Sequence, residues 1–412
     1  MTTPDAQTPP VGCVIGHSPV RLFGLDGAQR LERQLRAVGL RQVRHDGEAL
    51  PADGAVQLVR GDYLFDDRTL RDLAASPGTI LSVTDRRGTT MVAAHVPAEW
   101  AAEARALLAG TVPPPVIPDV SVRSAHGLSS AYLGKLLKAA PPVLLPISAG
   151  GAAALERHLF EGSYKGVTDL VTKWLWPLPA RWATGWCARW GVTPNAVTAL
   201  SFVLAVLTTL LFMRGAFALG LALGWLMTFL DTVDGKLARV TVTSTPFGHI
   251  FDHAIDVVHP PLWYLAWAYG VAGDANGLAP MQAAMVAIVV GYIAGRLIES
   301  AFEHGLAGFS LFTWRPIDSW FRLITARRNP NLLLLTGFAL AGLPRQGLDA
   351  VAVWTVLSSL ILAIRLGQAA IARSRRQALR PWLEEVGREH ADLPLYTRPF
   401  VANPAALQRL VP

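Results

Sequence analysis

Apolar residues are distributed unevenly along this chain. Up to about residue 140 they form short runs between polar segments, whereas residues 193–373 contain nearly all of the long apolar runs. A helix needs about 20 apolar residues to cross a bilayer. The pattern therefore predicts a soluble N-terminal domain at residues 1–140, followed later in the chain by a membrane domain.

The N-terminal part alternates predicted strands and helices. Short apolar runs predict strands at residues 11–15, 55–59, 79–83 and 90–94, and helical periodicity predicts helices at residues 27–38 and 68–75. This alternation is typical of an α/β sandwich with a mostly parallel sheet. The Pro-rich residues 112–118 end the pattern and are predicted to form a linker.

A tryptophan-rich segment precedes the membrane domain. Residues 165–191 contain five tryptophans together with Lys173, Arg181 and Arg189. Since tryptophan and basic side chains favour the boundary between water and lipid, residues 141–192 are predicted to be a linker with an interfacial amphipathic helix. A Trp-rich core helix of a soluble domain is the alternative.

Six apolar segments predict six transmembrane helices. Their approximate bounds are residues 194–213, 216–237, 247–271, 281–302, 332–343 and 348–371. The fifth segment is short for a span, and the second and third carry charged residues near one end. The predicted membrane domain covers residues 193–375, and residues 376–412 are predicted to form a cytoplasmic C-terminal tail.

Loop charges predict the orientation of these helices. Basic residues lie after the second, fourth and sixth segments, at Lys236, Arg239, Arg315, Arg322, Arg327, Arg328, Arg373, Arg375, Arg376 and Arg380. The opposite loops carry little positive charge, so the positive-inside rule places both termini, and the residues beside these loops, in the cytoplasm. The polar N-terminus lacks the apolar core of a signal peptide, in agreement with a cytoplasmic soluble domain.

The composition favours a membrane protein. Hydrophobic residues make up 51% and charged residues only 16% of the chain, whereas soluble proteins carry about 25% charged residues. The formal charge of +7 does not come from a basic stripe with interleaved aromatic residues, so nucleic acid is not an expected partner. The basic residues cluster beside apolar runs, which favours contact with membrane lipids. Cys13 and Cys187 lie in different predicted domains, which argues against a disulfide framework.

Four aspartates stand at paired helical spacings near the second and third segments. Asp231 and Asp234 are three residues apart and Asp252 and Asp256 are four apart, so each pair shares one face of a helix. The short connector at residues 241–247 predicts that the two helices are antiparallel neighbours. The four carboxylates are therefore expected to converge on one cavity.

Clustered carboxylates at membrane depth are rare and usually functional. Since like charges a few ångströms apart cannot all stay ionised without a partner, the cluster predicts one or two bound divalent cations. Oxygen ligands suit hard ions such as Mg²⁺, Mn²⁺ or Ca²⁺ rather than zinc, and such ions neutralise the charge on a transferring phosphate. Aspartates that only cap helix ends or face solvent are the alternative.

The same residues resemble a known signature. The motif D-x2-D-G-x2-A-R-x8-G-x3-D-x3-D of the CDP-alcohol phosphotransferases is matched at every fixed position, by Asp231, Asp234, Gly235, Ala238, Arg239, Gly248, Asp252 and Asp256. The run from Val192 to Asn195, which leads into the first span, is also typical of these enzymes. The resemblance covers residues 193–373.

This resemblance implies a fold of six membrane helices and a transfer reaction in phospholipid or related lipid biosynthesis. An alcohol hydroxyl would attack the β-phosphorus of a CDP-linked donor, such as CDP-diacylglycerol or a CDP-polyol, and CMP would leave. The motif implies a metal-binding set in which the last aspartate is also the general base: Asp231, Asp234, Asp252 and Asp256. It implies nucleotide contacts at Asp231, Gly235, Ala238, Arg239 and Gly248. Members of the family are often dimers, so a homodimer is also compatible with the resemblance.

A second basic run lies on the predicted cytoplasmic side. Guanidinium groups bind phosphate through paired hydrogen bonds, and this run contains Arg315, Arg322, Arg327 and Arg328. These residues are candidate ligands for an alcohol acceptor that is a phosphorylated polyol. A loop that is basic only because of membrane orientation is the alternative.

The N-terminal part resembles the nucleotidyltransferases. Residues 30–39 are similar to their first helix, and Asp62 is similar to their metal-binding aspartate at a strand end. The loop at residues 16–24 departs from their phosphate-binding loop, because it holds few glycines and Pro19 removes an amide donor. This α/β domain is therefore predicted to be degenerate, and a bifunctional chain that also makes the CDP donor is the alternative.

Two functions of other classes remain open from the residues alone. A transporter would use the aspartates as an ion path across the membrane. A membrane scaffold would not need them for any chemistry. Release of CMP from a CDP-linked donor distinguishes the enzyme from both.

Overall fold

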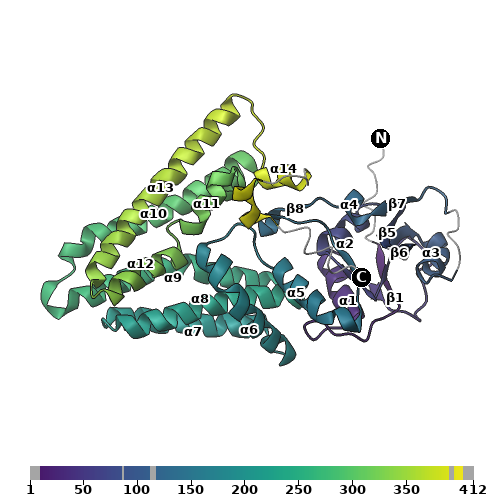
Figure 1. Cartoon of the computed structure of the whole chain (residues 1–412), viewed down its shortest axis with the longest axis horizontal. Coiled ribbons are helices and arrows are strands. Elements are labelled where there is room, and N and C mark those ends of the chain that lie inside the picture. Colours follow the sequence, from purple (N-terminus) through teal and green to yellow (C-terminus); the bar gives the residue numbers. More distant parts are fainter. Residues whose placement is uncertain (1–9, 86–87, 112–116, 389–393, 402–412) are drawn as a thin grey trace.

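The structure is a computed structural model that describes residues 10–85, 88–111, 117–388 and 394–401. An α/β region built from the N-terminal residues is followed by a helical domain (Figure 1). Residues 112–116 of the predicted linker lie outside the described residues, as do 389–393 and 402–412 of the predicted tail.

A six-stranded sheet forms the centre of the α/β region. Its strand order is β2-β1-β3-β6-β5-β7, and the bounds in that order are Val43–Arg44, Val11–Ile15, Ala55–Arg60, Gly88–Pro97, Thr79–Asp85 and Ser121–Ser124. All four predicted strands are present. The sheet is mixed rather than mostly parallel, because β6 runs antiparallel to both of its neighbours, β3 and β5. β5 and β6 follow each other directly in the sequence, and strands with so short a connection pair antiparallel.

Helices α1 (Gly27–Ala37), α2 (Asp67–Ala74) and α3 (Ala101–Leu108) pack against this sheet. The first two lie where the periodicity predicts them. α1 begins at a capping box, in which the Asp26 side chain accepts from the Gln29 amide at 2.8 Å. Each helix buries one apolar face, which is why the sequence pattern identifies it.

The chain leaves the α/β region through a second, smaller sheet. β10 (Leu144–Pro146) pairs antiparallel with β4 (Tyr63–Phe65), and α5 (Ala152–Gly162) follows it. Leu145 and Leu155 share one buried cluster with residues of the α/β region. The segment after residue 140 therefore packs closely on the N-terminal part.

Hydrogen bonds tie the α/β region to the helical domain. The buried Arg30 of α1 donates to the carbonyl oxygen of Val240 at 2.7 Å, and Arg33 donates to that of Thr241 at 2.8 Å. Both acceptors lie at the C-terminal end of α8 (Phe217–Val240), where the last carbonyls of a helix have no partner within it. The α/β region therefore caps α8.

Within the described ranges, four helices are long and apolar enough to cross a membrane: Pro194–Met213 (α7), Phe217–Val240 (α8), Ala279–Ala307 (which includes α10, Gln282–Ser300) and Pro344–Ser374 (α13). At the third and fifth predicted spans the structure has α9 (Pro246–Asn276) and α12 (Arg328–Leu340). Over the described residues neither meets the same criterion, since α12 has only 13 residues and Asp256, His259 and two prolines interrupt the apolar run of α9.

The outer faces of the long helices are apolar. Exposed side chains on α7, α10 and α13 include Phe202, Val206, Val290, Leu297, Val356 and Ile364. Exposed apolar faces of this extent mark contact with lipid rather than water. The chain is therefore an integral membrane protein.

The tryptophan-rich segment forms a π-helical turn, Val171–Leu175, and then α6 (Pro177–Arg189). Trp182 and Trp190 expose 71% and 73% of their surface beside the start of α7. Exposed indole rings at the end of a membrane helix favour the polar boundary of a bilayer. The position of this helix at a membrane interface stays a prediction.

The described part of the C-terminal tail packs on the protein. α14 (Trp382–Arg388) and the turn Leu395–Phe400 place Trp382 and Phe400 in one buried cluster with residues of the helical domain. Val401 forms a bridge with Ala139. These contacts bring the tail to the border between the two parts of the molecule.

Helix α7 lies against both α8 and α9. Helices α8 and α9 also meet through side chains, since the Trp263 ring of α9 lies 3.5 Å from the position of a Cβ on Gly224 of α8. The approach of α9 to α7 is close, because Trp263 donates to the carbonyl oxygen of Ala205 at 3.0 Å. At Gly270 a Cβ atom would lie 1.9 Å from the carbonyl oxygen of Phe212. Only glycine fits this contact.

Replacing Gly270 with alanine is expected to destabilise the helical domain. The added methyl would force α7 and α9 apart, and overpacking of this kind costs about 1–3 kcal/mol. The thermal unfolding midpoint of the detergent-solubilised protein should fall by several degrees.

Gly367→Ala is the matched control, since Gly367 also lies in a long helix and a Cβ there meets nothing within 4 Å. This variant should unfold at or above the wild-type midpoint, because alanine has the better helix propensity. Equal midpoints for the two variants would contradict the close α7–α9 contact.

Candidate active site

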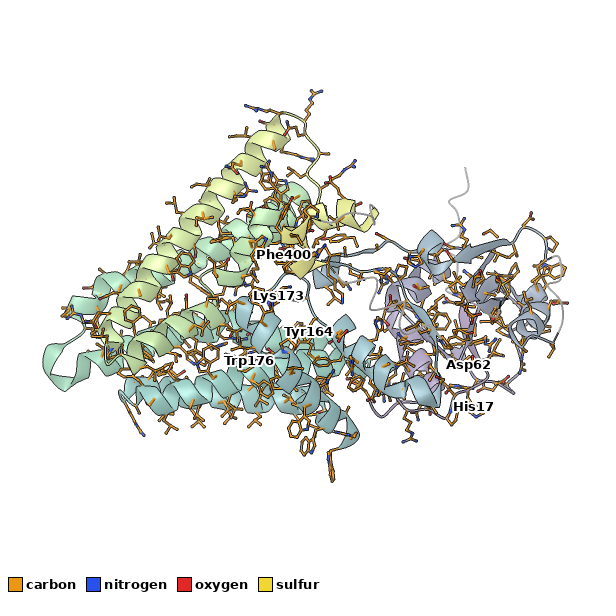
Figure 2. The ribbon with its side chains drawn as sticks, in the orientation of Figure 1. His17, Asp62, Tyr164, Lys173, Trp176 and Phe400 are labelled. Carbon is orange, nitrogen blue, oxygen red and sulfur yellow. The ribbon has the colours of Figure 1, made fainter. Side chains whose placement is uncertain are left out.

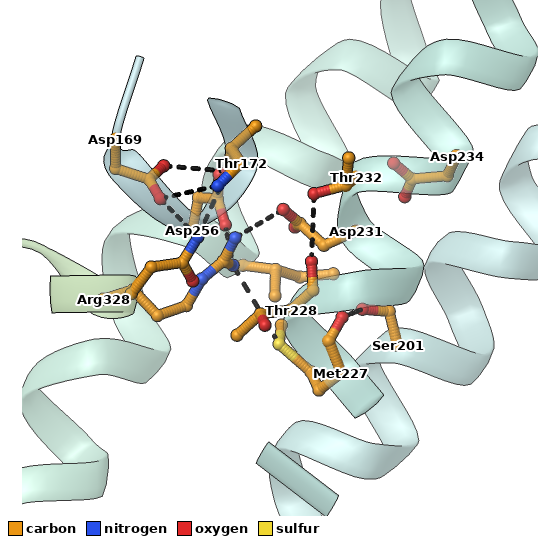
Figure 3. Close-up of polar contacts among 12 residues, drawn as sticks. Asp169, Thr172, Ser201, Met227, Thr228, Asp231, Thr232, Asp234, Asp256 and Arg328 are labelled. Carbon is orange, nitrogen blue, oxygen red and sulfur yellow. Dashed lines mark hydrogen bonds and ion pairs between the residues drawn. The ribbon is translucent and has the colours of Figure 1, made fainter. Parts of the chain in front are cut away.

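One arginine brings the first and last aspartates of the motif together. Arg328, at the start of α12, donates through Nη2 to Asp231 of α8 at 2.5 Å and through Nη1 to Asp256 of α9 at 2.6 Å. The side chains of Arg328 and Asp231 are 14% and 13% exposed, and that of Asp256 is 38% exposed. Figure 3 shows both carboxylates facing the guanidinium. Two carboxylates from separate helices thus share one cation.

Of the other two aspartates of the motif, the structure describes the side chain of Asp234 but not that of Asp252. Asp234 is buried, and its Oδ2 accepts from the Thr198 hydroxyl of α7 at 2.6 Å. Asp252 lies on α9 one turn before Asp256, and its side chain is outside what the structure describes. Among the described side chains, no group of three or more His, Cys, Asp or Glu lies close enough to hold a metal ion. The predicted four-carboxylate site stays a prediction.

Tandem prolines shape the backbone at Asp256. Pro260 and Pro261 lie inside α9 and have no amide hydrogen, so the carbonyl oxygens of Asp256 and Val257 lose their helical donors. The Tyr292 hydroxyl of α10 donates to these two oxygens, at 3.3 Å and 3.1 Å. Tyr292 therefore fixes the backbone that carries the candidate base.

A second network holds the start of α12 in place. Asp169 accepts from the amides of Val171 and Thr172 at 3.1 Å and 3.0 Å, and from the side-chain amide of Asn329 at 3.0 Å. Burial would raise the pKa of Asp169, but the nearby Arg322 guanidinium and these hydrogen bonds hold it below its usual range. Because Asn329 follows Arg328 directly, this ionised carboxylate positions the arginine (Figure 3).

The small residues of the motif lie where helices and side chains approach closely. A Cβ on Gly248 would lie 2.8 Å from Oδ1 of Asn195, at the start of α7. A Cβ on Gly235 would lie 3.1 Å from Nη2 of Arg239, so the arginine folds back over its own helix. Ala238 and Arg239 line a cavity between the two parts of the molecule.

The remaining arginines of the basic run have different partners. Arg327 forms an ion pair with Glu299, and Arg315 stacks on the Trp314 ring with 4.5 Å to its centroid. Arg322 lies over the ring of Phe312, and its buried Nη1 has no hydrogen-bond partner among the described residues. Among the contacts of the described side chains, Arg328 is the residue of this run that meets aspartates of the motif.

In the α/β region, backbone amides of the candidate nucleotide-binding loop donate to carboxylates of the protein itself. The amide of Gly16 donates to Asp46 at 3.1 Å, and the amide of Phe23 donates to Glu156 at 2.8 Å. Asp62 forms an ion pair with Arg60 at 2.7 Å. Figure 2 shows Asp62 on the α/β region, well away from the helical domain. These amides are not directed at a common anion.

Sequence reasoning missed several of these residues. Tyr292, Asp169 and Asn329 act on the site through contacts between distant segments, which no spacing within one helix reveals. Pro260 and Pro261 were a usable signal, since two prolines inside a predicted span require outside donors for two carbonyl groups.

The helical part of the chain is similar to known proteins. Residues 191–325 match the family model described as CDP-alcohol phosphatidyltransferase. The bifunctional IPC transferase and DIPP synthase of Rubrobacter xylanophilus is 31% identical over 182 residues, which are 43% of this chain and 38% of that protein. Cholinephosphotransferase 1 of Gallus gallus is 34% identical over 137 residues, which are 29% of this chain and 38% of that protein.

A solved structure shows a weaker likeness. The phosphatidylinositol phosphate synthase of Mycobacterium tuberculosis, crystallised with CDP-DAG bound, aligns over 46% of this chain and 90% of its own, with 23% identity and a TM-score of 0.34. The chain spans less than two fifths of the length of the two curated relatives above. The part of this chain that matches the CDP-alcohol phosphatidyltransferase family model is therefore residues 191–325.

Proposed function

We propose that this protein transfers a phosphate-linked group from a CDP-activated donor to an alcohol and releases CMP. The observation that carries the proposal is the convergence of Asp231 and Asp256, from separate helices of the matched domain, on one cation. A donor such as CDP-diacylglycerol or a CDP-polyol, and an alcohol or phosphorylated polyol as acceptor, fit the relatives' activities. The product would serve lipid synthesis in the membrane.

The aspartate carboxylates suit a divalent cation because they are negatively charged and offer oxygen ligands. The Arg328 guanidinium shows that Asp231 and Asp256 already point at a common positive charge. We propose that Asp231, Asp234, Asp252 and Asp256 hold Mg²⁺ or Mn²⁺, since hard oxygen donors favour these ions. A bound ion of this kind supplies charge neutralisation at the transferring phosphate.

The protein's own residues would then perform the proton transfer. Asp256 is the more exposed of the two paired carboxylates and can reach a hydroxyl from the open side. We assign it the role of general base toward the acceptor alcohol. Tyr292 would hold its backbone, and Arg328 would hold its carboxylate near that of Asp231 until substrate binds.

The surrounding motif residues complete the proposed donor and acceptor sites. Gly235, Ala238, Arg239 and Gly248 would contact the nucleotide, as the family motif implies. For an acceptor phosphate, Arg322 is the best placed of the basic run, because its buried Nη1 lacks a partner in the described part of the chain.

For the α/β region we propose a non-catalytic role. Its loop amides donate to Asp46 and Glu156 rather than converging on an anion, which argues against a triphosphate site. We further propose that both termini and the aspartates face the cytoplasm, as the loop charges predict.

Chelation of divalent ions is expected to stop the transfer reaction. Purified protein in detergent should release CMP from CDP-diacylglycerol or CDP-inositol when offered a panel of alcohols with Mg²⁺ or Mn²⁺, and excess EDTA should abolish this release. Chromatographic measurement of CMP provides the readout. Ion flux without any CMP would instead support a transporter.

The substitution Asp256→Asn is expected to lower kcat by about 100- to 10,000-fold, the usual contribution of a general base. Asp349→Asn is the matched control, because Asp349 is an exposed carboxylate of α13 with no role in the motif. The control should keep wild-type activity. Full activity of Asp256→Asn in correctly folded protein would refute the assigned role.

Loss of the Tyr292 hydroxyl is expected to lower kcat. Leaving buried carbonyl groups unsatisfied costs about 1–3 kcal/mol, so Tyr292→Phe should lower kcat about tenfold while KM for the donor stays within about twofold. A structural role alone would instead lower the yield of folded protein and leave its kcat unchanged. Steady-state kinetics at saturating metal distinguishes the two.

A further inference from the structure

A cavity of about 860 Å³ lies between the α/β region and the helical domain. Its wall combines Arg68 and Lys138 from the N-terminal part, Lys165 and Lys173 before the first span, and Arg239 of the α8 motif. Figure 2 shows Lys173 and Tyr164, which also lines the cavity, in the space between the two parts. Small-molecule sites measure about 300–1,000 Å³, so this cavity has the size of a ligand site.

The wall of the cavity is strongly basic. It holds seven arginine and lysine side chains and three carboxylates. Two of the arginines are used by the fold, since Arg30 donates to the Val240 carbonyl oxygen and Arg68 pairs with Asp66 at 2.7 Å. Leaving Arg239 aside, the four cationic side chains of Arg157, Lys138, Lys165 and Lys173 exceed the two remaining carboxylates, Asp67 and Glu161, so the cavity attracts anions.

The lysines of the wall are poorly compensated. Lys138 and Lys173 each donate to one carbonyl oxygen, that of Gly162 and that of Gly166, and burial lowers the pKa of both to about 8. Lys165 makes no hydrogen bond or ion pair to any residue that the structure describes. Clustered cations without counter-charges are costly, and a bound anion would remove that cost.

Helix α8 connects this cavity to the aspartates of the motif. Ala238 and Arg239 line the cavity, and they follow Asp231 and Asp234 on the same helix within about two turns. An anion held in the cavity would therefore lie next to the motif helix.

We propose that the cavity binds the phosphomonoester group of a water-soluble ligand of the transfer reaction. This inference rests on the proposed function and extends it, because the α/β region becomes one wall of the substrate site. A phosphorylated alcohol acceptor and the released CMP both carry this dianionic group. Lys165, Lys138 and Lys173 would bind it through charge-assisted hydrogen bonds.

Isothermal titration calorimetry of the full-length protein in detergent, with EDTA present, tests the proposal. The probes are glycerol 3-phosphate and CMP, with glycerol and cytidine as uncharged counterparts. At least one phosphomonoester should bind, and the uncharged compounds should not. Tight binding of only one probe identifies whether the acceptor or the nucleotide is the occupant.

Lys165→Gln and Arg157→Gln should each weaken phosphomonoester binding about 10- to 100-fold, the usual effect of losing a hydrogen bond to a charged group. Arg157 also lines the cavity, whereas the exposed Lys135 does not, so Lys135→Gln is the control and should bind like wild type.

Two results would overturn the cavity site: no binding of either phosphomonoester, or equal affinity in Lys165→Gln and Lys135→Gln. Because the titration involves no turnover, these results leave CMP release by the wild-type protein to be judged separately. CMP release without phosphomonoester binding would reject the cavity site alone.

Discussion

The ion-pair cluster of Arg328 with Asp231 and Asp256 is the constraint on which the candidate site depends. Carboxylates from α8 and α9 that lie this close repel each other unless a positive charge lies between them. Removing that charge would leave the largely buried Asp231 without a partner, which is destabilising. The two helices therefore stay close only while a cation, from the protein or from solution, remains between their carboxylates.

The rest of the structure supports this cluster from several sides. Asp169 and Asn329 fix the start of α12, and thereby the arginine. Tyr292 replaces the donors that the tandem prolines of α9 remove, and thereby fixes the backbone at Asp256. The α/β region caps the end of α8 through Arg30. A domain with no predicted chemistry of its own thus contributes to the position of the motif helix.

Local patterns in the sequence predicted the features that depend on one segment at a time. Strand β1, helix α1 and the spacing of Asp231 and Asp234 follow from periodicity within a few turns. The mixed order of the sheet and the position of α7 against both α8 and α9 depend on contacts between segments far apart. For the same reason the sequence placed Arg328 in a basic loop, and only the fold shows it between two aspartates.

Asp231 and Asp256 converge on one position that holds a cation. Titration of Mn²⁺ into the purified protein, followed by electron paramagnetic resonance, measures this directly through the loss of the free-ion signal. Wild-type protein should bind Mn²⁺, and Asp231→Asn should weaken that binding strongly although Asp256 is intact. Unchanged Mn²⁺ affinity in Asp231→Asn would contradict a shared site.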